Sequence, residues 1–264
     1  MKQLYLDCNM GAAGDMLAAA LYELLDDEGK QRFTETMNGL VPEGAEVSVR
    51  PETKCGILGT HFDVVINGEE EHSHDHDHDH DHDHGHEHHH HHHAHHSMAD
   101  VEAMISGFSG ISDDVKANIR EVYKVVAAAE SEVHGTPVSE IHFHEVGMMD
   151  AVIDVTAVCL LMDMLGPDKV AASPVRVGSG HMRCVHGILP IPAPAAANIL
   201  RGIPTYAGGI EAELCTPTGA ALLRHFASEF CGQPLMTVER IGYGMGTKNF
   251  EICNCMRALY GEAD

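Results

Sequence analysis

The chain has 264 residues, of which 44% are apolar, and a formal net charge of −24 with histidine counted as neutral. This length and composition predict one or two domains with a buried core. They exclude a membrane span, because no apolar run approaches the roughly 20 residues that a bilayer requires. The negative charge argues against nucleic acid as a partner, since an acidic surface repels phosphate backbones.

The first segment of the chain predicts strands and one helix. Its opening residues lack the basic and long apolar stretches of a secretory signal, so we expect a cytoplasmic protein. A strand is predicted at 4–7, and Gly11 and Gly14 form a turn before a helix that runs from Asp15 to about residue 26. Two further strands are predicted at 47–50 and 61–66.

Residues 72–96 carry 16 of the 23 histidines, first alternating with aspartate and then in a run. Such a segment has little apolar surface to bury, so we predict a disordered insertion at 67–97 within one α/β domain formed by 1–66 and 98–264. Neutral imidazole binds nickel, copper and zinc. The insertion therefore predicts metal storage or delivery, with a purification tag as the alternative. The predicted ligands are His74, His76, His78, His80, His82, His84, His88, His89, His90, His91, His92 and His93.

The remaining segment alternates helices with extended stretches. Helices are predicted at 112–134 and 149–165, from Pro194 to Gly202, and from Thr216 to about residue 230. Extended stretches are predicted at 141–144, 171–177, 236–240 and 256–260. This alternation predicts an α/β fold with a mixed sheet and flanking helices.

Two imidazoles and two carboxylates are predicted to converge around the loop at 146–149. In an extended stretch His142 and His144 share one face, while Asp150 and Asp154 share a face of the following helix. This set suits a metal site or a general base. The alternative to such a site is a purely structural role, in which Asp150 caps its helix and the histidines form local hydrogen bonds.

Two other stretches have the composition of ligand sites. Asp7 and Asp15 bracket the glycine turn at a strand end, where α/β folds often bind ligands, although Asp15 could simply cap its helix. Thr216, Thr218 and Gly219 open a helix and could bind an anion, or Thr216 could only cap it. The Gly242-x-Gly244-x-Gly246 stretch is not followed by a helix, so it does not predict a dinucleotide site.

Five blocks of the sequence, in this order, resemble the nickel-pincer cofactor insertion family, LarC. The first reads Leu6-Asp7-Cys8-Asn9-Met10-Gly11-Ala12-Ala13-Gly14-Asp15-Met16, and the second His142-Phe143-His144-Glu145-Val146-Gly147 with Asp150 and Asp154. The others are His186-Gly187-Ile188-Leu189-Pro190-Ile191-Pro192-Ala193-Pro194, Glu213-Leu214-Cys215-Thr216-Pro217-Thr218-Gly219-Ala220 and Gly242-Tyr243-Gly244-Met245-Gly246. A His-rich insertion between the first two blocks is also typical of the family.

The resemblance implies a lyase-type nickel chelatase, a cyclometallase. Such an enzyme inserts Ni²⁺ into pyridinium-3,5-bisthiocarboxylic acid mononucleotide, so that nickel is bonded to two sulfurs and to the ring carbon between them. The reaction uses CTP with Mg²⁺ or Mn²⁺, and its product serves lactate racemase and related enzymes.

The resemblance also implies roles for individual residues. The expected catalytic residues are Asp7, Asp15, His142, His144, Glu145 and Asp150. Gly11, Gly14, His186, Thr216, Thr218 and Gly219 are expected to bind substrate or phosphate, and His142, His144, Asp150 and Asp154 are expected to bind metal in an ordered site.

Family members continue well beyond the last matching block, whereas this sequence stops at residue 264. We therefore expect the chain to be the amino-terminal portion, acting with a carboxy-terminal partner polypeptide that holds most of the CTP site. A non-catalytic nickel storage or delivery protein is the main alternative, and a metal-dependent hydrolase is a second. The sequence leaves a homo-oligomer open.

Overall fold

The predicted α/β fold with a mixed sheet is confirmed. The computed structural model describes residues 1–41, 45–66, 69–70, 96–143, 146, 149–184 and 186–263. The predicted ligands from His74 to His93 lie outside these residues, while 69–70 and 96–97, at the margins of the predicted insertion, form short strands. The helices are α1 (Gly14–Glu23), α2 (Asp27–Asn38), α3 (Met98–Gly107), α4 (Asp113–His134), α5 (Met149–Leu165), α6 (Pro194–Ile199) and α7 (Pro217–Phe226), with a 3₁₀ turn η1 (Val138–Glu140).

The largest sheet follows the order β12-β7-β1-β14-β13-β3-β2 and has β1 near its centre. Strand β1 pairs parallel with β7 and antiparallel with β14, which makes the sheet mixed. The sheet strands are β1 (Lys2–Asp7), β2 (Ala45–Lys54), β3 (Ile57–Ile66), β4 (Glu69–Glu70), β7 (Lys169–Ala172), β12 (Glu229–Phe230), β13 (Thr237–Met245) and β14 (Cys255–Glu262). The other strands are β5 (His96–Ser97), β6 (His142–Phe143), β8 (Val175–Arg176), β9 (His181–Cys184), β10 (Gly187–Pro190) and β11 (Thr205–Tyr206).

Successive side chains of β1 point to opposite faces of the sheet. Leu4 and Leu6 belong to the main core, which also contains Phe62 from before the insertion and Leu161 from after it. Tyr5 belongs to a smaller apolar cluster on the opposite face. One core therefore joins the two segments that flank the insertion.

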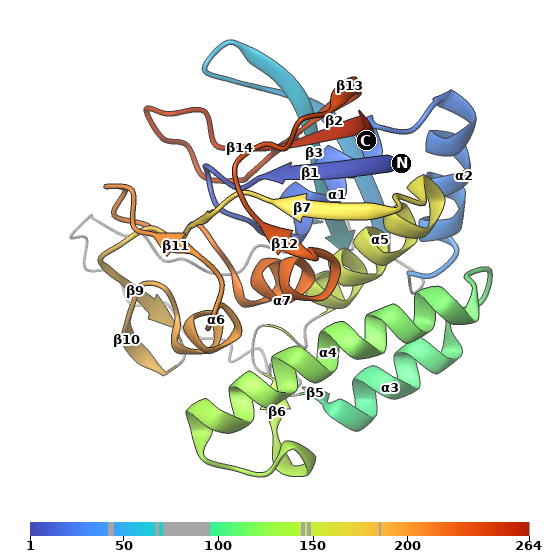
Figure 1. Cartoon of the computed structure of the whole chain (residues 1–264). Helices are drawn as coiled ribbons and strands as arrows, with labels where there is room; N and C mark the ends of the chain where they lie inside the picture. Colours follow the sequence, from blue (N-terminus) through green and yellow to red (C-terminus); the bar gives the residue numbers. More distant parts are fainter. Residues whose placement is uncertain are drawn as a thin grey trace, which may run out of the picture.

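The helices form two layers beside the sheet, as Figure 1 shows. Helix α1 packs on β13, β3 and β14 and also on α5 and α7, and α4 packs across α5, α6 and α7. Helix α5 is almost entirely apolar and most of its residues are buried. It therefore forms the centre of the helical part of the molecule, and Asp150 and Asp154 near its start are exceptions to its composition.

The Gly242-x-Gly244-x-Gly246 stretch is a packing site for α1. A Cβ added to Gly242 would overlap the carbonyl oxygen of Ala20, and a Cβ added to Gly244 would overlap that of Met16. Glycine therefore lets the helix backbone lie directly on strand β13. This contact fixes α1, and with it the position of Asp15, against the sheet.

Differences from the predicted elements have local causes. Helix α5 has its predicted bounds, but α7 ends at Phe226, because Glu229 and Phe230 pair with β7 instead of continuing the helix. The extended stretch at 171–177 is divided at Pro174 into β7 and β8. Helices α2 and α3 and the β9–β10 hairpin were not predicted.

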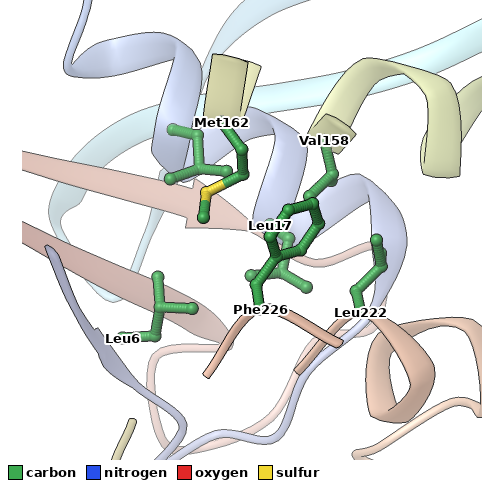
Figure 2. A pocket seen from close by; sticks show the side chains of 7 residues that line it. Leu6, Leu17, Val158, Met162, Leu222 and Phe226 are labelled. Atoms are coloured by element: carbon green, nitrogen blue, oxygen red, sulfur yellow. The ribbon is translucent and has the colours of Figure 1, made fainter. Parts of the chain in front are cut away.

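A small cavity lies in the core between β1, α1, α5 and α7 (Figure 2). It has a volume of about 10 Å³ and is lined only by apolar side chains: Leu6, Leu17, Leu21, Val158, Met162, Leu222 and Phe226. A cavity of this size and lining does not hold a polar molecule. It is a packing gap and is not a substrate site.

We predict that Gly244→Ala destabilises the fold by about 2 kcal/mol or more, because overpacking at a rigid backbone contact has this order of cost. Chemical denaturation measures the effect. Gly232→Ala is the matched control, because a Cβ at position 232 meets nothing within 4 Å. Equal stability of the two variants would show that α1 does not depend on this close contact.

Candidate functional site

Four aspartates gather around the start of α1. Asp15 lies in the first turn of α1, Asp150 and Asp154 lie in α5, and Asp63 lies in β3. The charge of Asp154 interacts with those of Asp15, Asp150 and Asp63. We call these four residues the carboxylate cluster. It brings together three residues that the sequence predicted and one, Asp63, that it did not.

Glycine at position 14 allows Asp154 to approach α1. A Cβ on Gly14 would lie 2.7 Å from both Cβ and Oδ2 of Asp154, a distance that real side chains do not adopt. The backbone N–H of Asp15 donates a hydrogen bond to the Asp154 carboxylate. The N-cap residue of α1, Ala13, has no capping side chain, so Asp154 from α5 satisfies a donor at this helix start.

His61 supplies the positive charge beside the cluster. It is 1% exposed, its Nδ1 lies 2.9 Å from the carbonyl oxygen of Met245, and its Nε2 lies 2.8 Å from Oδ1 of Asp63. Both partners are acceptors, so this arrangement requires a proton on each ring nitrogen. Burial lowers the pKa of His61, but the hydrogen bonds and the charges of Asp63 and Asp15 outweigh it, and the pKa is raised.

The carboxylates at the centre of the cluster hold protons more tightly than ordinary aspartates do. Burial, opposed in part by backbone hydrogen bonds and by the charge of His61, raises the pKa of Asp15 to about 6. Burial and then the charge of Asp15 raise the pKa of Asp154 well above its usual range. Two adjacent carboxylates that cannot both ionise easily can take up a proton near neutral pH.

Tyr123 of α4, which interacts with Asp150 and Asp154 of the cluster, also contacts Phe143 of β6 and Val146. Phe143 is buried against the ring of Tyr123, with the ring centroids 5.9 Å apart, and the Tyr123 hydroxyl donates to the Val146 carbonyl at 3.0 Å. Phe143 is therefore part of the core. His144 and Glu145 lie outside the described residues, and of His142 only the backbone is described.

Asp7 makes its contacts in a different network, at the end of β1. Its Oδ2 lies 2.5 Å from Nη2 of Arg257, and its Oδ1 accepts from the side chain of Asn9. The hydroxyl of Tyr206 donates to Oδ1 of Asn9 at 2.9 Å, and Arg176 donates to the backbone oxygen of Asn9 at 3.3 Å. Asp7 thus orders the loop that leads to α1.

The start of α7 packs against the same loop. The Thr216 hydroxyl accepts from the N–H of Gly219 at 3.2 Å and lies 3.0 Å from the hydroxyl of Thr218, so Thr216 caps the helix. Gly219 packs against the carbonyl of Ala12, and Gly11, with φ of +88°, packs against that of Leu214. The geometry agrees with the alternative that Thr216 caps the helix, and the predicted binding of an anion at this helix start stays a prediction. Both glycines allow close approach of backbones.

His186 lies at the turn of the β9–β10 hairpin. Its ring centroid is 5.0 Å from that of His134, the last residue of α4. Sequence reasoning did not select His134 as a site residue, because a single histidine at the end of a long helix carries no spacing signal.

Two properties are absent from the part of the chain that the structure describes. No three His, Cys, Asp or Glu side chains in it already surround a point that could hold a metal ion. None of its helices has both the length and the apolar character needed to cross a bilayer.

A comparison with known protein families shows which family the chain belongs to. A family described as nickel insertion protein matches residues 4–264. The chain belongs to this nickel insertion family. No solved structure matches it significantly.

Curated relatives extend beyond the matched region. The pyridinium-3,5-bisthiocarboxylic acid mononucleotide nickel insertion proteins of Clostridium kluyveri and Desulfitobacterium hafniense are each 39% identical to the chain. The matches cover 100% and 99% of the chain but only 63% and 59% of those proteins. A putative nickel insertion protein of Dictyoglomus thermophilum is 36% identical over 99% of the chain and 61% of its own length. The chain therefore spans about three fifths of these members of the nickel insertion family.

We predict that Asp15→Asn stabilises the protein at neutral pH. A carboxyl whose folded pKa is raised binds more protons in the folded than in the unfolded state, so its contribution to stability falls as pH rises. The stability difference between the variant and the natural chain should be near zero at pH 4. It should reach on the order of 3 kcal/mol at pH 7, from a shift of the pKa from 3.8 to about 6.

Urea unfolding at several pH values measures this difference. Asp163→Asn is the control, because it makes the same change at an exposed position on α5. A stability difference for Asp15→Asn that stays constant from pH 4 to pH 7 would contradict the shifted pKa.

Proposed function

We propose that the chain is the amino-terminal portion of a CTP-dependent cyclometallase that inserts nickel into pyridinium-3,5-bisthiocarboxylic acid mononucleotide. The names of the relatives support this substrate. The product would be the nickel-pincer nucleotide cofactor of lactate racemase-type enzymes. We place the reaction in the cytoplasm and class the enzyme as a lyase-type nickel chelatase.

The observation that carries the proposal is the carboxylate cluster. Insertion replaces the hydrogen on the ring carbon between the two thiocarboxylates by nickel. The carbon–hydrogen bond breaks, its electron pair becomes the carbon–nickel bond, and the proton needs an acceptor. Asp15 and Asp154 share a raised affinity for protons, which suits a general base that works near neutral pH.

Nickel would be held next to this base by neighbouring ligands. We propose His142, His144 and Asp150 for this role, with Glu145 as a further candidate. Their neighbours in sequence, Phe143 and Val146, belong to the core that also contains α5, which supports this proposal. Imidazole and carboxylate are both suitable ligands for nickel. The His-rich insertion would hold the ion before it is delivered.

Gly11 and Gly14 would keep the backbone at the start of α1 close to the bound substrate. We propose that the substrate phosphate lies near the Asp7–Arg257 pair, because Arg257 keeps a partly exposed guanidinium there.

The amide of Gly219 and the hydroxyl of Thr218 already have partners within the protein. A triphosphate therefore fits the start of α7 poorly, which supports a CTP site on a carboxy-terminal partner polypeptide.

We predict that Asp154→Asn lowers the rate of insertion by about 10²-fold or more, the usual scale for loss of a general base. The assay combines the chain with the carboxy-terminal polypeptide, CTP, Mg²⁺, Ni²⁺ and the bisthiocarboxylate mononucleotide. Mass spectrometry detects the product, which has gained one nickel and lost one ring proton.

Asp163→Asn provides the matched control, because it makes the same change at an exposed position on the same helix. Undiminished insertion by Asp154→Asn would exclude Asp154 as the base, and undiminished insertion by Asp15→Asn as well would exclude the carboxylate cluster. If the natural chain binds nickel but yields no product, the storage alternative is correct.

A further inference from the structure

Two cysteines, Cys253 and Cys255, lie where the loop after β13 leads into β14. The N–H of Cys255 donates to the carbonyl of Cys253 at 2.9 Å, which closes a three-residue turn around Asn254. Asn254 is buried, its side chain donates to the carbonyl of Lys248 at 2.9 Å, and its own carbonyl accepts from Gly246 at 3.0 Å. The turn that carries the two cysteines is therefore fixed at its centre.

This turn brings the two thiols into contact. The Cys255 thiol forms a hydrogen bond with the side chain of Cys253, and the Sγ of Cys253 lies 3.4 Å from the carbonyl oxygen of Lys54. Both cysteines are free and partly exposed, so an ion from solution can reach them. Two thiolates on one ion, with metal–sulfur bonds of about 2.3 Å and an angle of about 90–110°, lie roughly 3.3–3.8 Å apart. Sulfur atoms in contact are already close to this separation.

The two thiols lie next to the Asp7–Arg257 pair. Cys255 and Arg257 are two residues apart on β14, so their side chains point to the same face of the sheet. The charges of Arg257 and Asp7 both act on the Cys255 thiol. The thiols therefore lie near the position that we propose for the substrate phosphate.

The Cys255 thiol keeps its proton until a metal ion displaces it. Burial, followed by the hydrogen bond with Cys253, raises the pKa of Cys255 to about 12. A metal ion binds the thiolate, so binding releases the proton. An ion that must displace a proton is held less tightly at neutral pH, which suits a site from which the ion moves on.

Thiolate ligands distinguish nickel from the other metals of the proposed reaction. Sites of nitrogen, oxygen and sulfur ligands bind Ni²⁺ more strongly than Mn²⁺, and Mg²⁺ prefers oxygen ligands. The net charge of −24 also favours the approach of a cation. Nickel is therefore the ion of that reaction that the two thiols fit best.

We propose that Cys253 and Cys255 form a dithiolate site that binds Ni²⁺ and supplies it to the insertion reaction. Binding forms two nickel–sulfur bonds and breaks two sulfur–hydrogen bonds, and both protons pass to solvent without any transfer of electrons. The thiols take up protons again when the ion leaves. The proposal rests on the proposed function for the role of the bound ion, but nickel binding itself does not require the chain to be an enzyme.

The test uses the 264-residue chain with the histidines from His74 to His93 replaced by asparagine, kept reduced and titrated with Ni²⁺ alone. We expect a sulfur-to-nickel charge-transfer band in the near ultraviolet, and no such band with Mg²⁺. Cys253→Ser and Cys255→Ser should each remove the band and weaken binding by at least about ten-fold, because loss of a direct ligand costs no less than loss of an outer partner. Cys184→Ser is the matched control, since Cys184 is a partly exposed thiol on β9.

A second measurement does not depend on substitutions at the site. Cys253 and Cys255 fall in one tryptic peptide, residues 249–257, so mass spectrometry follows their alkylation by iodoacetamide. Ni²⁺ should slow this alkylation, because a metal-bound sulfur is a poorer nucleophile, and should leave that of Cys184 unchanged.

Three results would each overturn the proposal: a charge-transfer band that persists in both serine variants, a band lost equally in Cys184→Ser, or alkylation of the peptide at the same rate with and without Ni²⁺. Because neither experiment contains CTP, substrate or partner, nickel binding by the two thiols can be confirmed even if nickel insertion is not.

Discussion

The approach of Asp154 to the first turn of α1 determines the chemistry of the site. The absence of a side chain at Gly14 lets the carboxylate of α5 accept the N–H of Asp15. This hydrogen bond satisfies a helix donor, but it also places a second carboxylate beside Asp15 in a poorly solvated position. The hydrogen bond and the packing of α1 on Gly242 and Gly244 hold the two acids together against their repulsion. A raised affinity for protons is the result.

Tyr123 connects α4 to the residues near the start of α5. Its ring packs on Phe143, its hydroxyl donates to the Val146 carbonyl, and α5 begins with Asp150 and Asp154 in its first turns. Carboxylates that are partly buried suit acceptance of a proton. The separate Asp7–Arg257 pair orders the loop between β1 and α1 and does not join the carboxylate cluster.

The sequence predicted those parts of the site that depend on local geometry. Asp150 and Asp154 are four residues apart on a strongly apolar helix, so their shared face and the bounds of α5 could both be derived. His61 and Asp63 were missed as site residues, because they reach the cluster only through the long-range pairing of β3 with β13. The contact of His134 with His186 likewise depends on how a hairpin packs against a distant helix. The glycines of β13 were visible as a motif, but only the packing of α1 explains them.

The most direct test of this account is the titration of the aspartate carboxyl carbons by ¹³C NMR in the 264-residue chain, with Asp15 and Asp154 assigned from their asparagine variants. The account predicts that Asp15 titrates near pH 6 because it is buried, and that the midpoint of Asp154 falls in the Asp15→Asn variant because the charge of Asp15 raises the pKa of Asp154. Titration of both Asp15 and Asp154 near pH 4 in the natural chain would contradict it, because neither carboxylate would then be adapted to accept a proton at neutral pH.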